Sequence, residues 1–386
     1  MIVREKLKGN DIALFFGTWA PMHLGHISAI HQAKRSHDGV ILIACGREND
    51  RGAKIGLGLT KRFRYVRETF KEDELVHVVK VDETGIPEYP EGWSQWLELV
   101  EEQVQQNLVD KVDITIYVGE KEYEEKLTIL RPDWKVVRIN RELLPISATK
   151  IRENPMKYWR QIAKPFRRHF SKNVLIAGSA SGGKTTLVKD LARSYGSSFS
   201  LEYARYYQKK YNVLDEELNG KDYTYLLANQ YRQTSNEIEG SGNNGLVIAD
   251  TNSTVTKAYM DWYLTTDKKM AEKQGKMLIT ESEKKALDLQ YATTIEQEKW
   301  ALILIIPPVT RYIDDHFRDM TMAEDAVRWA FHEHLITLFK EAGLMDKVVV
   351  LESVPTESDP QGFYGRYTEA QRIIKERLNL SIWDGQ

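Results

Sequence analysis

Short apolar runs in the first half of the chain alternate with stretches in which apolar residues recur at helical spacing. Five of these runs predict buried strands, at residues 12–16, 40–44, 76–81, 114–118 and 136–139. Three of the stretches between them predict helices, at residues 27–35, 61–69 and 93–107. Strands that alternate with helices are typical of a parallel α/β sheet.

A second series of the same kind follows a break in the pattern. Its predicted strands are residues 174–177, 246–249, 301–306 and 348–351, and its longest predicted helices are 221–239 and 323–342. The break, at 154–172, interleaves basic and aromatic residues with two prolines. Such a segment can bind nucleic acid, but between two α/β series it predicts a connector. We therefore expect two domains, residues 1–160 and 161–386, and a polar surface insertion at 265–283.

Composition limits the functional classes. The 386 residues are 42% hydrophobic and 28% charged, enough apolar content for buried cores, and the net charge of −2 implies no general attraction to nucleic acid or membranes. Cys45 is the single cysteine, which excludes an internal disulfide framework and favours a reducing compartment. No apolar run has the length of a membrane span or signal sequence. We expect a cytoplasmic protein with no nucleic-acid partner and no membrane insertion.

The second series begins with a phosphate-binding motif. Residues 178–185 read GSASGGKT, which matches G-x-x-x-x-G-K-[ST] between a predicted strand and a predicted helix. Backbone amides of such a loop surround nucleotide phosphates, Lys184 is expected to reach the β and γ phosphates, and the Thr185 hydroxyl is expected to bind Mg²⁺. Asp250 directly follows the predicted strand 246–249. It is expected to face Mg²⁺ or a substrate hydroxyl, although an aspartate at this place can also begin a turn.

Charged residues gather after the predicted strand 301–306. Arg311 and Arg318 stand among the acids Asp314, Asp315 and Asp319. Arginines in such a loop can close over a transferred phosphate, and the alternative is a solvated charged turn. The residues themselves do not decide between these two interpretations.

The first series contains GTWAPMHLGH at residues 17–26, with His23 and His26 three positions apart. A zinc site would need further ligands, and neither a cysteine pair nor a nearby carboxylate has suitable spacing. A phosphate site fits better, because Gly17 ends a strand and His26 begins a helix whose N-terminus attracts anions. The later stretch ISATKIR, residues 146–152, adds capping hydroxyls and Arg152, which capping alone does not explain.

These two stretches resemble the H-x-G-H and I-S-x-T-x-x-R motifs of nucleotidylyltransferases, specifically the nicotinamide mononucleotide (NMN) adenylyltransferases. With residues 82–93 (DETGIPEYPEGW) and the phosphate-binding loop, nearly the whole chain resembles the bifunctional NadR family, in which an NMN adenylyltransferase is fused to a ribosylnicotinamide kinase. The resemblance implies an α/β fold, with a Rossmann-like nucleotidylyltransferase domain followed by a P-loop NTPase (kinase) domain.

The resemblance, together with the motifs, assigns residues to five expected sites. The expected catalytic residues are His23, His26, Arg152, Lys184 and Asp250. ATP of the adenylyltransferase is expected at Gly17, Thr18, Trp19, His23, His26, Gly119, Ile146, Ser147, Thr149 and Arg152. NMN is expected at Thr18, Trp19, Gly46, Arg51, Trp93 and Trp96, where core packing is the alternative for the tryptophans. ATP of the kinase is expected at Gly178, Ser181, Gly182, Gly183, Lys184, Thr185, Thr186 and Arg318, with Mg²⁺ at Thr185 and Asp250. The riboside is expected at Glu202, Arg205, Asp250, Tyr312 and Asp315.

The implied activity uses ATP twice, with Mg²⁺. Nicotinamide riboside is phosphorylated to NMN, and NMN is adenylylated to NAD with release of pyrophosphate. The chain departs from the family pattern at Ala180, Tyr206, Asn252 and Tyr312. The alternative is therefore an adenylyltransferase whose P-loop domain senses nucleotides without kinase turnover. We expect no N-terminal helix-turn-helix, and the sequence leaves a homo-oligomer open.

Overall fold

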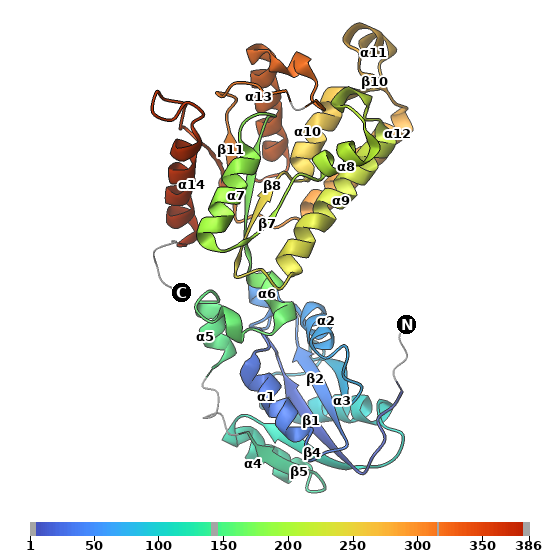
Figure 1. The fold of residues 1–386 in the computed structure, drawn as a ribbon. Coiled ribbons are helices and arrows are strands. Elements are labelled where there is room, and N and C mark those ends of the chain that lie inside the picture. The colour runs from blue at the N-terminus through green and yellow to red at the C-terminus, as the bar shows by residue number, and fades with distance from the viewer. Residues whose placement is uncertain (1–4, 140–145, 315, 381–386) are drawn as a thin grey trace. The chain divides into compact units, whose positions relative to one another are not determined.

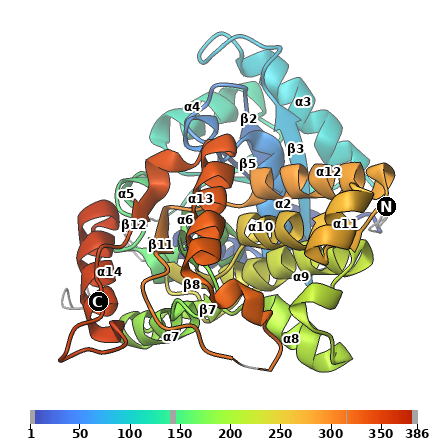
Figure 2. The same cartoon turned by 90° about the horizontal axis from the view of Figure 1, so that it is seen from above.

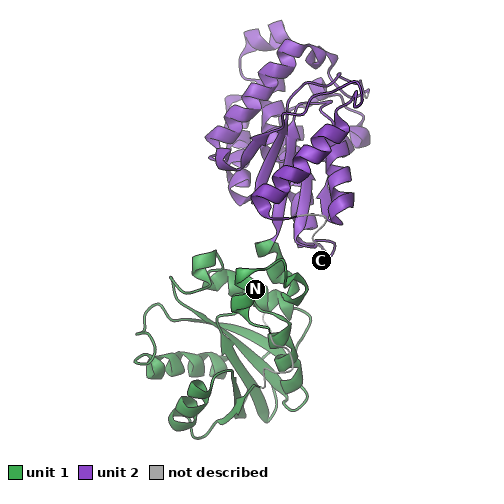
Figure 3. Ribbon diagram, turned by 90° about the vertical axis from the view of Figure 1, so that its left-hand side faces the viewer, with its two compact units in different colours: residues 1–170 green, residues 171–386 purple. Residues whose placement is uncertain are grey.

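The computed structural model describes residues 5–139, 146–314 and 316–380, which fall into two compact units. Unit 1 comprises Met1–Phe170 and unit 2 comprises Ser171–Gln386, shown in green and purple in Figure 3. Each unit is built around its own five-stranded sheet. None of the described helices is both long and apolar enough to cross a membrane.

The sheet of unit 1 is entirely parallel, with the order β3-β2-β1-β4-β5 (Figure 1). Its strands are β1 (Asp11–Gly17), β2 (Gly39–Gly46), β3 (Val76–Asp82), β4 (Asp113–Val118) and β5 (Lys135–Arg138). Its helices are α1 (Leu24–Ala33), α2 (Leu59–Thr69), α3 (Trp93–Gln106), α4 (Lys121–Leu130), α5 (Ala148–Glu153) and α6 (Lys164–Phe170). The strand order reverses between β1 and β4, the point at which open parallel sheets bind ligands.

Alternate residues of the unit 1 strands enter two cores, one on each face of the sheet. On β1, Ile12 and Leu14 pack with α3 and α4, whereas Ala13 and Phe15 pack with α1, α2, α5 and α6. Side chains of a strand alternate between faces, so both sets are buried only where helices cover both faces. The strands appear in the sequence as continuous apolar runs because helices bury both of their faces.

The segment predicted as a connector folds onto unit 1. Trp159, Ile162 and Phe166 are buried in the core beneath α1 and α2, and Arg168 forms an ion pair with Glu68 of α2. Aromatic side chains gain most from burial, so this segment packs instead of remaining extended. The boundary between the compact units consequently lies after residue 170, ten residues beyond the expected domain boundary, and the division of activity at residue 160 stays a prediction.

Unit 2 has a second parallel sheet, with the order β12-β11-β6-β8-β7. Its strands are β6 (Lys172–Gly178), β7 (Ser198–Ser200), β8 (Leu246–Asp250), β11 (Leu302–Ile306) and β12 (Val348–Val350). Its helices are α7 (Lys184–Tyr195), α8 (Tyr203–Tyr211), α9 (Gly220–Glu239), α10 (Ser253–Tyr263), α11 (Lys268–Gln274), α12 (Glu281–Gln297), α13 (Asp325–Glu341) and α14 (Phe363–Leu378). Helices α7 and α14 cover one face of this sheet, and α10 and α13 cover the other.

The polar stretch 265–283 forms a small substructure at the edge of unit 2. It contains α11, which has no buried residue, and the short strand β10 (Met277–Leu278), which pairs with β9 (Leu264–Thr265). Helices α9, α10 and α12 pack together beside it (Figures 1 and 2). The exposed α11 agrees with the expected surface insertion.

Candidate active sites in the two units

A cleft of about 920 Å³ lies at the carboxyl ends of β1, β2 and β4 and is called the unit 1 cleft below. Its lining includes most residues that the sequence assigned to the adenylyltransferase. These are Gly17, Thr18, Trp19, His23, His26, Arg51, Trp93, Trp96, Gly119, Ile146, Ser147, Thr149 and Arg152. Gly46 does not line the cleft; a Cβ at this position would collide with the guanidinium of Arg62.

The two histidines occupy the first turn of α1. His23 is the N-cap residue, its backbone N–H donates to Nδ1 of His26 (3.3 Å), and the two rings stack with centroids 3.6 Å apart. Trp19 packs edge-on against His26 and anchors the loop by donating from Nε1 to the carbonyl oxygen of Ile43 (2.9 Å). Both imidazoles therefore lie at a helix N-terminus that faces the cleft, where anions are favoured. Among the described residues, no group of three histidine, cysteine or acidic side chains could hold a metal ion.

The stretch 146–152 reaches the same cleft from α5. Ser147 caps this helix, accepting from the backbone N–H of Lys150 (3.3 Å). Arg152 donates to the carbonyl oxygen of Ala20 (2.7 Å) and to Oγ1 of Thr149 (2.9 Å), so it joins the two sequence motifs directly. Burial, and then the nearby charge of Arg51, lower the pKa of Arg152. Two arginines that share one cleft provide a positive site suited to phosphate.

The loop after β2 is held by a residue that the sequence analysis missed. Arg62 of α2 is fully buried and pairs with both carboxylate oxygens of Asp50, while also donating to the carbonyl oxygens of Cys45 and Leu57. The same loop carries Arg51, which donates to Oγ1 of Thr18 (3.0 Å). Arg62 thus fixes a loop that places a cation in the cleft. Its position in a basic, amphipathic helix gave no signal of burial.

In unit 2, residues 178–183 form the expected loop between β6 and α7. Gly178 and Gly183 have φ values of 141° and 83°, and a Cβ at Gly178 would lie 2.6 Å from the carbonyl oxygen of Ile306. Lys184 donates from Nζ to the carbonyl oxygen of Ser179 (3.0 Å). The loop conformation therefore requires glycine at positions 178 and 183.

The two residues expected to bind Mg²⁺ are in contact. The hydroxyl of Thr185 donates to Oδ2 of Asp250, which is completely buried. Burial raises the pKa of Asp250 to about 6, although the charge of Lys184 opposes this shift. Carboxylate and hydroxyl oxygens are suitable ligands for Mg²⁺, so this donor set fits the ion.

The expected riboside residues lie near a carboxylate that the sequence did not single out. Arg205 pairs with Glu202 (3.4 Å) and donates to Gln208 (3.0 Å), which donates in turn to Oδ1 of Asp215 (2.8 Å). Burial raises the pKa of Asp215 to about 6. Asp215 begins the acidic run Asp215–Glu217, which looks like ordinary surface in the sequence. Asp315 lies outside the described residues.

The charged loop after β11 contacts the phosphate-binding loop. Ser181 accepts from the backbone N–H of Ile313 (2.9 Å) and contacts Arg318, and its carbonyl oxygen accepts from the Thr310 hydroxyl (2.7 Å). Arg318 also donates to the carbonyl oxygen of Ile313 (2.6 Å). This arrangement favours the lid interpretation for Arg318, whereas Arg311 is exposed.

The departures from the family pattern have separate structural settings. Asn252 caps α10 and donates to Glu298 (2.8 Å), so it has a structural role of its own. Ala180 is buried, Tyr206 is exposed, and the guanidinium groups of Arg318 and Arg328 both lie within 6 Å of the centre of the Tyr312 ring, at 5.8 and 5.7 Å. The structure gives no reason for Ala180 or Tyr206.

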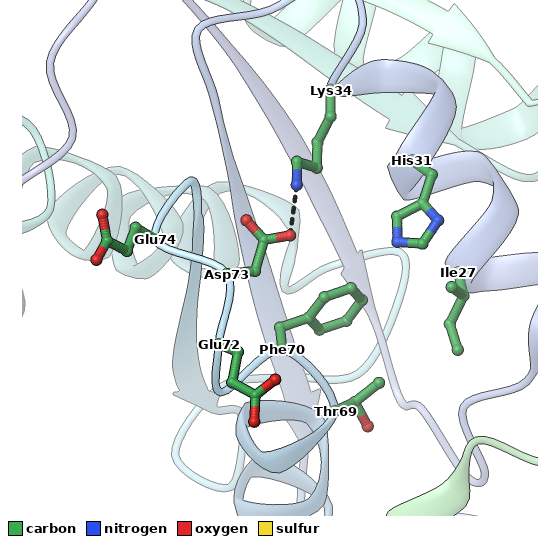
Figure 4. A pocket seen from close by; sticks show the side chains of 8 residues that line it. All are labelled: Ile27, His31, Lys34, Thr69, Phe70, Glu72, Asp73 and Glu74. Atoms are coloured by element: carbon green, nitrogen blue, oxygen red, sulfur yellow. Dashed lines mark hydrogen bonds and ion pairs between the residues drawn. The ribbon is translucent and has the colours of Figure 1, made fainter.

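A second hollow of unit 1, of about 610 Å³, lies between α1 and the turn after α2 (Figure 4). An ion pair between Lys34 and Asp73 spans it, and His31 lies along its α1 side. It contains none of the residues assigned to a site from the sequence. Lys34 and Asp73 are partners of each other, and no chemistry is assigned to this hollow.

Comparisons with known proteins agree with this arrangement. The cytidylyltransferase-like family matches residues 14–154, and the AAA domain family matches residues 173–357. The trifunctional NAD biosynthesis/regulator protein NadR of Salmonella typhimurium is 24% identical over 96% of this chain and 84% of that protein. The protein of the same name from Escherichia coli is 28% identical over 66% of this chain and 63% of its own length.

Two solved structures match this chain over nearly its whole length. A NadR protein in complex with NR is 38% identical, with a TM-score of 0.86, over 99% of this chain and 100% of that one. The chain belongs to the NadR family. A NadR protein in complex with NAD and AMP-PNP is 37% identical over the same shares, with a TM-score of 0.82. The family and the fold class predicted from the sequence, a nucleotidylyltransferase domain followed by a P-loop domain, are confirmed.

Proposed function

We propose that this NadR-family chain is a bifunctional enzyme of NAD biosynthesis and salvage. It phosphorylates nicotinamide riboside to NMN with ATP, and it adenylylates NMN with a second ATP to give NAD and pyrophosphate. The proposal rests on one observation: the chain has two separate candidate phosphate-binding sites, the unit 1 cleft and the loop at Lys184. One of the related NadR proteins was solved in complex with NR and the other in complex with NAD and AMP-PNP.

The kinase reaction is assigned to unit 2. The 5′-hydroxyl oxygen of the riboside bonds to the γ-phosphorus of ATP, the bond to the β-γ bridging oxygen breaks, and ADP leaves. Asp250 orients the hydroxyl and accepts its proton as the new bond forms, and Lys184 stabilises charge on the transferred group. Thr185 and Asp250 would hold Mg²⁺, which supplies charge neutralisation on the phosphates when bound. Arg318 closes over the nucleotide from the lid, and Glu202, Arg205 and Tyr312 bind the riboside.

The adenylyltransferase reaction is assigned to the unit 1 cleft. A phosphate oxygen of NMN bonds to the α-phosphorus of ATP, and pyrophosphate leaves with the electrons of the broken bond. The nucleophile is already an anion, so neither a covalent intermediate nor a general base is required. His23, His26 and Arg152 stabilise the charge that develops on the phosphates. We further propose that the enzyme works in the cytoplasm, where a single unpaired cysteine is stable.

Purified full-length protein with Mg²⁺-ATP tests both assignments by chromatography of the products. With nicotinamide riboside the wild type should form NMN and NAD. The His26→Ala variant should form NMN but no NAD. The Lys184→Ala variant should not convert the riboside but should still convert NMN to NAD. Matched controls are His31→Ala, on the same helix but facing the hollow of Figure 4, and Lys189→Ala, further along α7. Failure of the wild type on both substrates would refute the proposal.

The departures at Ala180 and Tyr206 favour one second candidate, in which unit 2 senses nucleotides without phosphorylating the riboside. The same assay distinguishes it. Conversion of NMN without conversion of the riboside, together with ATP binding that Lys184→Ala abolishes, would support the sensor.

A further inference from the structure

The aspartate assigned to the kinase reaction is followed by a strained residue. Asp250 ends β8, and Thr251 has a φ of 79°, which places a β-branched residue in the left-handed region. Such a conformation costs free energy and persists only where its surroundings hold it. The backbone N–H of Thr251 donates to the carbonyl oxygen of Ile176 (3.3 Å), and its carbonyl oxygen accepts from Nε2 of Gln230 (3.3 Å). The turn after Asp250 is therefore held by groups from β6 and α9.

Asn252 holds the next position of the same turn. Its Oδ1 accepts from the backbone N–H of Val255 (3.1 Å) and so caps α10. Its Nδ2 donates to Oε2 of Glu298 (2.8 Å) and to Oγ1 of Thr254 (3.3 Å). The residue is only 1% exposed, so these contacts do not compete with bulk water. Both ends of the Asn252 amide are thus used, one within α10 and the other to reach Glu298.

Glu298 is the acceptor for three donors that meet at this point. Its Oε2 accepts from Asn252 and from Nε1 of Trp300 (2.7 Å), and its Oε1 accepts from the backbone N–H of Ser253 (3.1 Å). All three groups donate, so a carboxylate satisfies them together and an amide does not. Burial raises the pKa of Glu298, and these hydrogen bonds oppose the shift. The carboxylate thus ties residues 252 and 253 to the segment that precedes β11.

Glu298 is itself firmly placed between α12 and β11. Its backbone N–H donates to the carbonyl oxygen of Ile295 (3.2 Å) at the end of α12. Two residues later the ring of Trp300 is buried in the core of unit 2, and the backbone N–H of Ala301 donates to the carbonyl oxygen of Asn173 (2.9 Å) in β6. Glu298 therefore gives the turn after Asp250 a fixed point outside α10.

We propose that Glu298 and Asn252 form a carboxylate–amide pair that positions Asp250 for the kinase reaction. Asn252 lies two residues after Asp250, so a shift of the pair moves the turn and with it the carboxylate that contacts Thr185. Glu298 acts through Asn252 and is a positioning residue. The inference rests on the kinase function proposed above. It also explains the departure at Asn252, because an aspartate there would place a second carboxylate at hydrogen-bond distance from Glu298, and the two would repel each other.

Replacing Asn252 with aspartate separates positioning from helix capping. Aspartate caps a helix as well as asparagine does, and its charge is favourable at a helix N-terminus, so a residue that only caps α10 would tolerate the change. If the pair positions Asp250, kinase kcat should fall at least about tenfold, while KM for ATP stays within about twofold because the loop at Lys184 is unchanged. The matched control is Asn219→Asp, the same change at the N-cap of α9, and its kcat should equal that of the wild type.

The reciprocal exchange tests the pair directly. Glu298→Gln alone makes an amide nitrogen face a donor, so kinase kcat should fall about threefold or more. With both changes the glutamine amide can donate to the new carboxylate, so kcat should recover at least about threefold over Asn252→Asp alone. The recovery is partial because Trp300 shares the acceptor that the exchange removes. Glu296→Gln, on an exposed residue of α12, is the control for the second change and should leave kcat unaltered.

Mg²⁺-dependent binding of AMP-PNP gives a measurement that needs no turnover. The binding that Lys184→Ala abolishes belongs to unit 2, and Asn252→Asp should raise the Mg²⁺ concentration for half-maximal binding at least about fivefold. Native-state hydrogen exchange of peptides from β6 and β11 shows whether each variant is folded, and Glu298→Gln carries the comparison if Asn252→Asp folds poorly.

An unchanged kcat and Mg²⁺ dependence in Asn252→Asp, or a double variant no better than Asn252→Asp alone, would overturn the inference and leave the proposed function intact. A wild type that converts NMN but not the riboside would instead overturn the kinase function. The AMP-PNP titration would then decide the inference without it.

Discussion

Replacing Arg62 with methionine should destabilise unit 1 by breaking a buried ion pair. Arg62 is fully buried, the Asp50 side chain is 14% exposed, and the variant leaves that carboxylate facing apolar surroundings. Loss of one partner of a buried pair costs about 3–5 kcal/mol. Asp50 keeps its hydrogen bonds from the amides of Gly52 (2.7 Å) and Ala53 (2.8 Å), so we expect the low end, about 3 kcal/mol.

The pKa of Asp50 gives the pH dependence of this loss. Burial alone would raise that pKa, but hydrogen bonds and charge from Arg62, with the two loop amides, bring it below 3.8. A lowered pKa contributes stability that is present above the ordinary value and is lost as the pH falls through the folded value. The difference between wild type and Arg62→Met should therefore be constant near neutral pH and should shrink below about pH 4.

The measurement should report on unit 1 separately, because a chain of two units need not unfold in one step. Native-state hydrogen exchange of peptides from β2 and α2 gives that local free energy, and peptides from unit 2 serve as the internal reference. The KM for NMN should rise about tenfold as the loop carrying Arg51 loses its anchor. Asp50→Asn added to Arg62→Met should recover about 1–2 kcal/mol. A loss below about 1 kcal/mol, or no recovery in the double variant, would refute the reasoning.

Three further predictions concern unit 2. Ser181→Ala removes the hydroxyl that joins the lid to the phosphate-binding loop, so the kinase KM for ATP should rise about threefold or more in steady-state assays; an unchanged KM would contradict it. Gly183→Ala forces an L residue to φ 83° and places a Cβ 2.9 Å from the ring of Phe363, so kinase activity should fall at least about tenfold while NMN adenylylation is retained. The pKa of Asp215 is raised to about 6, so its ionised form is disfavoured in the folded state. Asp215→Asn should therefore raise the free energy of unfolding of unit 2 by about 1 kcal/mol at pH 7.5 and by less at pH 5, and an equal effect at both pH values in thermal unfolding would count against it.

Features set by residues close together in the chain could be predicted from the sequence. The strands β1, β2 and β6 have continuous apolar runs, and the loops at 17–26 and 178–185 carry their own glycines and donors. Among the elements that the sequence did not predict, β7 and α4 have weak local signals. Strand β7 has three residues, too few for a periodic signal, and α4 has a single buried residue, so it shows little apolar pattern.

What the sequence alone determined was therefore the fold class, the family and the two phosphate-binding motifs, because each depends on local backbone preference and on spacing within a few residues. Only the tertiary structure decided which distant groups meet. Arg152 reaches the carbonyl oxygen of Ala20 across 132 positions, and Arg318 reaches Ser181 across 137, because the order of the parallel strands brings their carboxyl ends to one edge. Burial of Arg62 likewise depends on packing from several elements at once, so no single stretch of sequence reveals it.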